Sequence, residues 1–268
     1  MSITKRLDEA RKAFAKRDKK AAAAAHTPER IQVAHKERHG GFGSEYIGDI
    51  VYGGLDGIIT TFAVISSVMG AGLEISIVLI MGIANLLADG FSMSAGAFLS
   101  TKSEQERYQG ELEREYWEVE NFPDAERQEL IEIYRQEGFS EEEANQLVEI
   151  ISRDDDRLVD RMMSDELGLE KIEGNPINNA LATFISFIIF GAVPLSVYVV
   201  GLFVDIPLET AYPISILLTS LALFALGATK VLVTGQSPLR SGLEMLLVGG
   251  LSAVVAYGIG ALLEGLVN

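Results

Sequence analysis

The sequence predicts an all-α membrane protein with five transmembrane helices and a helical domain inserted between the second and the third. Five apolar runs predict the helices, because about 20 helical residues cross the roughly 30 Å hydrocarbon core of a bilayer. The runs cover residues 47–71, 75–100, 177–204, 212–233 and 243–263. The insert is predicted by charge, since most acidic residues lie between the second and the third run.

The distribution of Lys and Arg predicts the orientation in the membrane. All 22 of them lie in three stretches, residues 1–40, 101–175 and 230–240. These are the N-terminal segment and every second connection between the apolar runs, so all three stretches fall on the same side of the membrane. Because cytoplasmic loops carry the excess of Lys and Arg, the N-terminus and the insert are expected in the cytoplasm. No targeting signal precedes the first run, so the expected location is a prokaryotic plasma membrane.

Composition divides the chain into four expected parts. Residues 1–40 form a basic segment, 41–100 the first two spans, 101–175 an acidic domain and 176–268 the last three spans. The acidic domain has 24 Asp and Glu against 9 Lys and Arg, a net of −15 in a protein of net charge −16. With no Cys in the chain, disulfides and thiolate metal sites are excluded.

Local signals predict four helices in the acidic domain. Residues 103–120 continue the second span, and Pro123 suits the first turn of the next helix. Ser140 and Glu143 form a capping box for a third. A fourth is predicted over 154–167, because three acids stand at its positive dipole end.

Paired glutamates make this domain a candidate metal-binding module. Glu115 and Glu118 are three residues apart, as are Glu126 and Glu129, so each pair shares a helix face and could bind one ion. A multivalent cation would relieve the repulsion among fixed carboxylates. For any single pair the alternative is a solvated helix face.

Two methionines strengthen the metal hypothesis. Met162 and Met163 precede Glu166 by about one helical turn, which sets thioethers beside a carboxylate in an otherwise polar helix. Such ligands favour a transition-metal ion such as Fe²⁺ over Ca²⁺ or Mg²⁺. The alternative is that both methionines pack in the domain core.

Acids inside the first span predict a path for cations. Asp49 and Asp56 are seven residues apart and therefore project from nearly the same face, with Glu45 one turn earlier at the cytoplasmic mouth. Asp49 also fits a helix end that reaches the interface. Asp56 lies about two turns inside the apolar run, where an acid is expensive and therefore a functional candidate.

The second span carries a matching polar stripe. Asn85, Asp89 and Met93 follow one another at four-residue spacing on a helix of small and apolar residues. Facing the acids of the first span, Met93 would be a soft ligand in the same path. The pathway is therefore predicted to belong to the first two spans.

Three sequence runs carry a resemblance to a known family. They are GDIVYGGLDG at 48–57, DGFSMSAGA at 89–97 and MMSDEL at 162–167. Together they resemble the vacuolar iron transporter family over roughly residues 45–265. The resemblance implies a homodimer with five spans per subunit, a cytoplasmic helical metal-binding domain and proton-coupled export of Fe²⁺ from the cytosol.

The resemblance also implies roles for particular residues. The metal-domain ligands of the family correspond here to Glu115, Glu118, Glu126, Glu129, Glu166, Met162 and Met163. The membrane path corresponds to Asp49, Asp56 and Met93, with Glu45 at its entrance. One departure is that plant-type members have Glu where this sequence has Ala97.

The expected function is proton-coupled transport of Fe²⁺ or Mn²⁺, with Co²⁺ or Zn²⁺ as substitutes and no organic cofactor. The expected partners are the bilayer, divalent ions, protons and a second copy of the chain, without nucleic acid. The chain has no Gly-Lys-Ser/Thr phosphate loop, nucleophile elbow or zinc protease motif, so no enzymatic activity is expected. The alternatives are a membrane-anchored metal buffer or sensor, and a passive cation channel.

Overall fold

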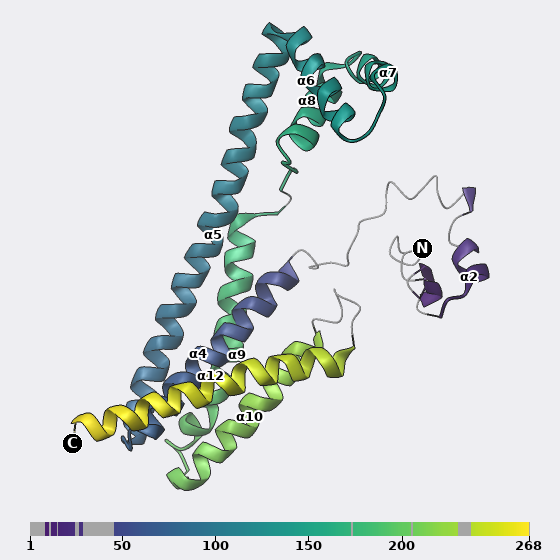
Figure 1. Cartoon of the computed structure of the whole chain (residues 1–268). Coiled ribbons are helices and arrows are strands. Elements are labelled where there is room, and N and C mark those ends of the chain that lie inside the picture. Colours follow the sequence, from purple (N-terminus) through teal and green to yellow (C-terminus); the bar gives the residue numbers. More distant parts are fainter. Residues whose placement is uncertain are drawn as a thin grey trace. The chain divides into compact units, whose positions relative to one another are not determined.

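The computed structural model describes residues 9–10, 12–14, 16–24, 27–28, 46–172, 174–204, 206–229 and 237–267. Within these residues the regular elements are helices (Figure 1). The chain forms two compact units. The first comprises Met1–Gly90 and Ile185–Asn268, and the second Phe91–Phe184.

Five helices in the described residues are long and apolar enough to cross a membrane, which confirms the predicted number of spans. They are α4 (Ile47–Gly70), α5 (Ile75–Asn121), α9 (Pro176–Val200), α10 (Leu208–Thr229) and α12 (Pro238–Val267). The last helix begins five residues before its apolar run, because Pro238 suits a first helical turn and Arg240 pairs with Glu244 at 3.3 Å.

In the first unit, α4 packs against both α10 and α12, and α12 also packs against α10. Ile58 of α4 joins Leu223 and Leu226 of α10 and Met245 of α12 in one buried cluster. Where α9 meets α4, the Ser186 hydroxyl donates a hydrogen bond to a backbone carbonyl of α4. The helix bearing the predicted pathway acids is thus held on several sides.

A close crossing between α4 and α12 provides a test of this packing. A Cβ atom at Gly260 would lie 2.2 Å from the backbone oxygen of Ser67, whereas Gly258 has nothing within 4 Å. Gly260→Ala is therefore expected to cost about 1–3 kcal/mol through forced backbone displacement. Gly258→Ala should be neutral or slightly stabilising, because Ala is the better helix former.

Thermal unfolding in detergent micelles measures the difference. The melting temperature should fall by several degrees in Gly260→Ala only. Equal melting temperatures for the two variants would contradict the tight crossing.

The second unit contains the polar end of α5 and the helices α6 (Pro123–Gln136), α7 (Glu141–Ile151) and α8 (Asp155–Arg161) (Figure 1). The continuation of the second span is observed, because α5 runs unbroken past residue 100, where its apolar part ends. Pro123 is the first residue of α6, and Ser140 and Glu143 form the predicted capping box. Local signals thus determined where these helices begin.

The predicted helix over 154–167 differs in the structure. It winds as α-helix only to Arg161 and continues as a π-helical turn, η3 (Met162–Glu166). The wider turn accommodates Met162 and Met163, two consecutive side chains that are both fully buried. Whether two neighbouring methionines are buried depends on tertiary packing, which helix caps and residue spacing do not predict.

The basic N-terminal segment is described only in part. Within it, α2 (Lys19–Ala24) is capped by the Asp18 carboxylate, which accepts hydrogen bonds from the backbone nitrogens of Lys20 and Ala21. The predicted pathway residue Glu45 lies outside the described residues.

Candidate metal sites

Three predicted ligands come together in the second unit. Carboxylate oxygens of Glu115 and Glu118 on α5 and of Glu126 on α6 all lie within 4.8 Å of one another. Three of the four glutamates paired in the sequence therefore form one cluster, and the fourth, Glu129, is not part of it. Three carboxylates from two helices can surround a single cation, because each contributes at least one oxygen ligand.

Burial distinguishes this cluster from a solvated acidic surface. Glu115 is 0% and Glu126 5% exposed, and one Oε2 atom of each is buried without a hydrogen-bond partner. Buried polar atoms are normally paired, so two orphaned carboxylate oxygens in one cluster require an explanation. A positive ion between them would supply the missing interaction.

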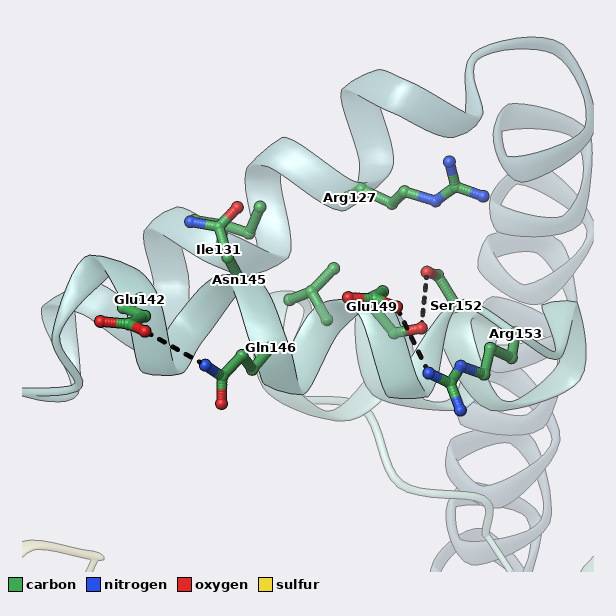
Figure 2. A pocket seen from close by; sticks show the side chains of 9 residues that line it. Arg127, Ile131, Glu142, Asn145, Gln146, Glu149, Ser152 and Arg153 are labelled. Atoms are coloured by element: carbon green, nitrogen blue, oxygen red, sulfur yellow. Dashed lines mark hydrogen bonds and ion pairs between the residues drawn. The ribbon is translucent and has the colours of Figure 1, made fainter.

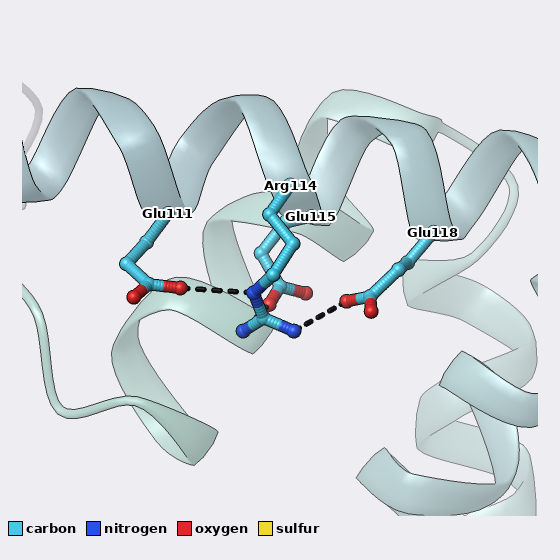
Figure 3. A network of polar contacts seen from close by, with 4 residues as sticks. All are labelled: Glu111, Arg114, Glu115 and Glu118. Atoms are coloured by element: carbon cyan, nitrogen blue, oxygen red, sulfur yellow. Dashed lines mark hydrogen bonds and ion pairs between the residues drawn. The ribbon is translucent and has the colours of Figure 1, made fainter.

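Arg114 occupies the cluster in this structure (Figure 3). Its guanidinium pairs with Glu111 at 2.9 Å, with Glu115 at 2.6 Å and with Glu118 at 2.5 Å. Arg114 was not among the residues predicted from the sequence, although acids three residues before and four residues after an Arg have the spacing that brings helical side chains together.

Burial shifts the protonation of the two inner carboxyls. Desolvation raises the pKa of Glu115 to about 7; Arg114 opposes the shift, and the charges of Glu166, Glu126 and Glu118 add to it. Desolvation also raises the pKa of Glu126 to about 7, reinforced by Glu129, Glu118 and Glu166. Near neutral pH these groups can therefore exchange protons for another cation.

These pKa values predict opposite pH effects on two properties. The metal-free domain binds protons on Glu115 and Glu126 more tightly than the unfolded chain, whose Glu pKa is 4.5. Their contribution to the free energy of unfolding is therefore complete below about pH 4.5 and is lost as the pH rises through about 7. Metal affinity should instead fall by about tenfold per carboxyl for each pH unit below 7, because ligands must be deprotonated.

Melting temperatures of the metal-free protein and Co²⁺ titrations, at about pH 6 and about pH 8, test both trends. Glu126→Gln is the control, since it removes one of the two titrating carboxyls and should make both pH dependences shallower. A Co²⁺ affinity that does not change over this range would contradict the prediction.

The structure puts two other predicted ligands at the border of the cluster. Glu129 is exposed, and its charge raises the pKa of Glu126. Glu166 on η3 is largely exposed by its surface area, and it similarly affects Glu115; partial desolvation of its carboxyl, followed by the charge of Glu129, raises its own pKa. Both carboxylates are thus within electrostatic range of the three central ones, and their role as ligands remains a prediction.

Met162 and Met163 lie in the hydrophobic core of the unit. They are 0% and 1% exposed and share a cluster with Val119 of α5 and Leu130 of α6. This is the core-packing alternative considered for them, and coordination by their sulfur atoms remains a prediction. The Tyr134 hydroxyl donates a hydrogen bond to the Asp165 carboxylate at 3.1 Å, which connects η3 to α6.

The membrane acids of the first unit are half-buried. Asp49 and Asp56 lie on α4, and Asp56 is flanked by the buried Gly53 and Gly57. The carboxylate of Asp56 is close enough to Asp89 on α5 for their charges to interact. A shared path along the first and second spans, with Asp49, Asp56, Asn85, Asp89 and Met93 as its lining, remains a prediction.

Two further polar groups belong to the same helices. The Asn85 side chain is half-buried, and its Nδ2 atom is buried without a partner, as is the hydroxyl of Thr61 on α4. Met93 is half-buried two turns after Asn85 on the same helix. Asn85 and Thr61 thus add unpaired polar atoms to spans one and two.

A separate cavity of about 560 Å³ lies between α6 and α7 (Figure 2). Arg127, Gln146 and Glu149 are among its lining residues, and Arg153 and Glu149 within it pair at 3.3 Å. Five of its polar residues bond to one another along α7 and the two residues after it: Glu142 with Gln146, and Glu149 with Ser152 and Arg153. We therefore place the candidate metal site in the glutamate cluster and not in this cavity.

Comparison with known proteins reveals similarity along the chain. Residues 47–261 match the model of the VIT family. A vacuolar iron transporter of Toxoplasma gondii is 38% identical over 96% of this chain and 88% of its own length. Those of Plasmodium falciparum and Centaurea cyanus are 34% and 36% identical, covering 98% and 84% of this chain and 98% and 90% of their own lengths. The matched region contains both groups of carboxylates described above.

Proposed function

Because this chain belongs to the vacuolar iron transporter (VIT) family, we propose that it exports Fe²⁺ from the cytosol in exchange for protons, with Mn²⁺ as a second substrate. Co²⁺ and Zn²⁺ should substitute in binding assays. The observation that carries the proposal is the cluster of Glu115, Glu118 and Glu126, in which two buried carboxylate oxygens have no partner.

The acidic domain, proposed as residues 101–175, would collect the ion. Its net charge of −15 attracts divalent cations, and the cluster offers them oxygen ligands at a fixed site. Carboxyls with a pKa of about 7 favour reversible loading, because a small change in local pH alters their charge. Glu129, Glu166, Met162 and Met163 are proposed as additional ligands.

The membrane path would consist of Glu45, Asp49, Asp56, Asn85, Asp89 and Met93. Asp56 and Asp89 support this proposal, since two interacting carboxylates in an apolar region repel each other unless a proton or a cation lies between them. Protons arriving from the opposite side would neutralise the carboxylates and release the metal. In a homodimer, two first spans would contribute their acids to one path.

We propose that the N-terminus and the acidic domain face the cytoplasm. Support comes from the 22 Lys and Arg, all in segments assigned to one side, while the short turn near residue 72 and the loop near residue 206 have none. For a prokaryotic cell the membrane would be the plasma membrane. Accessibility of single cysteines introduced on either side to a membrane-impermeant thiol reagent would test the orientation.

Flux into vesicles tests the function. The purified protein is reconstituted with a pH gradient, and Fe²⁺ entry is followed by quenching of an enclosed fluorescent chelator. Entry should depend on the opposing proton gradient and should alkalinise the lumen in step with metal movement, because protons leave as the metal enters. A metal buffer would give binding without flux, and a passive channel would give flux that follows voltage instead of pH.

A further inference from the structure

We propose that Arg114 is a built-in counter-cation, whose guanidinium must leave Glu115 and Glu118 before a divalent ion binds, and that it thereby sets the metal affinity of the cluster. This inference rests on the proposed metal-binding function of that cluster. It adds a residue that makes no contact with the ion and acts by competing with it.

The guanidinium uses the oxygens that a metal would need. Its Nη2 atom lies 2.6 Å from Oε1 of Glu115 and its Nη1 atom 2.5 Å from Oε2 of Glu118. Both glutamates belong to the group whose carboxylate oxygens converge within 4.8 Å. A divalent ion binds carboxylate oxygens at about 2.0–2.6 Å, so it cannot share these oxygens with a guanidinium without strong charge repulsion.

Arg114 leaves the buried part of the cluster unsatisfied. Only Oε1 of Glu115 is paired with it, while Oε2 of Glu115 and Oε2 of Glu126 remain buried without partners. One positive charge therefore compensates only part of a cluster that contains three carboxylates. An ion that reaches the two orphaned oxygens gains contacts that Arg114 cannot make, which gives the exchange its direction.

The Arg114 side chain has an alternative position outside the cluster. Arg114 is 41% exposed, and its Nε atom also pairs with Glu111 at 2.9 Å, an acid outside the converging group. Its guanidinium can therefore turn away from Glu115 and Glu118 while keeping a carboxylate partner (Figure 3). Because the guanidinium can stay paired with Glu111, it can leave Glu115 and Glu118 without losing all of its carboxylate partners.

The proposal predicts two effects of opposite sign when the charge is removed. Without Arg114, the carboxylates of Glu111, Glu115 and Glu118 repel one another, so the metal-free domain becomes less stable. Metal binding becomes tighter, because no internal cation has to be displaced. A residue that merely supported the fold would lower both stability and affinity.

The test uses the full-length protein in detergent and compares wild type with Arg114→Gln. Calorimetric titration with Co²⁺ should show about tenfold tighter binding, the size of one charge-assisted hydrogen bond. The melting temperature of the metal-free protein should fall, and Co²⁺ should restore it. Arg135→Gln is the matched control, because Arg135 pairs with Glu132 at 2.8 Å in the same domain and should leave Co²⁺ affinity unchanged.

Arg114→Lys keeps the charge but cannot make the forked contacts, so its Co²⁺ affinity should lie between wild type and Arg114→Gln. If Arg114→Gln does not fold, the Co²⁺ affinity of Arg114→Lys tests the role of Arg114 instead. Unchanged or weaker Co²⁺ binding in the folded variants would overturn the role of Arg114. Absence of Co²⁺ binding in wild type would instead refute the metal site itself.

Discussion

Asp56→Ala is expected to reduce proton-driven Fe²⁺ flux in reconstituted vesicles by about 100-fold or more. Asp56 is half-buried on α4, and its charge interacts with that of Asp89 on α5. The attractive pair is the one between this carboxylate and the bound cation, and removing one partner of such an ion pair away from water typically costs about 3–5 kcal/mol. Such an energy corresponds to a loss of about two to nearly four orders of magnitude in affinity.

The flux experiment includes two controls. Asp56→Asn keeps the shape and removes the charge, so it should fail like Asp56→Ala. Glu244→Gln removes an acid that is exposed near the start of α12 and paired with Arg240, and it should transport normally. Wild-type flux in Asp56→Ala would end the proposed pathway.

The second large effect is expected in the acidic domain. Changing Glu115, Glu118 and Glu126 together to Gln should abolish high-affinity Co²⁺ binding, since it removes all three converging carboxylates. The neutral side chains also relieve the repulsion and desolvation that raise the pKa of Glu115 and Glu126, so the metal-free protein should become more stable. Loss of binding together with a higher melting temperature would distinguish a lost site from a lost fold.

The matched control removes the same charge elsewhere in the domain. Glu120, Glu137 and Glu149 are exposed, and the triple change to Gln at these positions should keep Co²⁺ stoichiometry and affinity close to those of wild type. Equal losses in both triple variants would mean that diffuse negative charge, and not the cluster, binds the ion.

The sequence by itself determined the number of spans and the places where several helices begin. Runs of apolar residues longer than a bilayer core predict spans regardless of their neighbours, and five such helices are present in the described residues. The capping box at Ser140 and the proline that opens α6 are equally local, because a cap depends on atoms within one helical turn. The family resemblance also came from the sequence and is confirmed.

The sequence could name the carboxylates of the site but not their arrangement. Among 24 acids in the domain, spacing favoured two separate glutamate pairs. The packing of α6 against α5 instead joins Glu126 to the pair on α5 and leaves Glu129 exposed. Burial depends on contacts between residues distant in sequence, so helical periodicity could not distinguish these two glutamates.

Only the tertiary structure decided which residues are tightly packed and which charged side chains pair with one another. Gly258 and Gly260 look alike in the sequence, yet only Gly260 touches the backbone of α4. By its sequence spacing, Arg114 looks like any other arginine on a helix surface. Only the structure shows that it pairs with the buried carboxylate of Glu115, which is the basis for its proposed role as a counter-cation. The physical reason is that desolvation and close packing are set by three-dimensional neighbours, whereas helix length, caps and net charge are set by the chain itself.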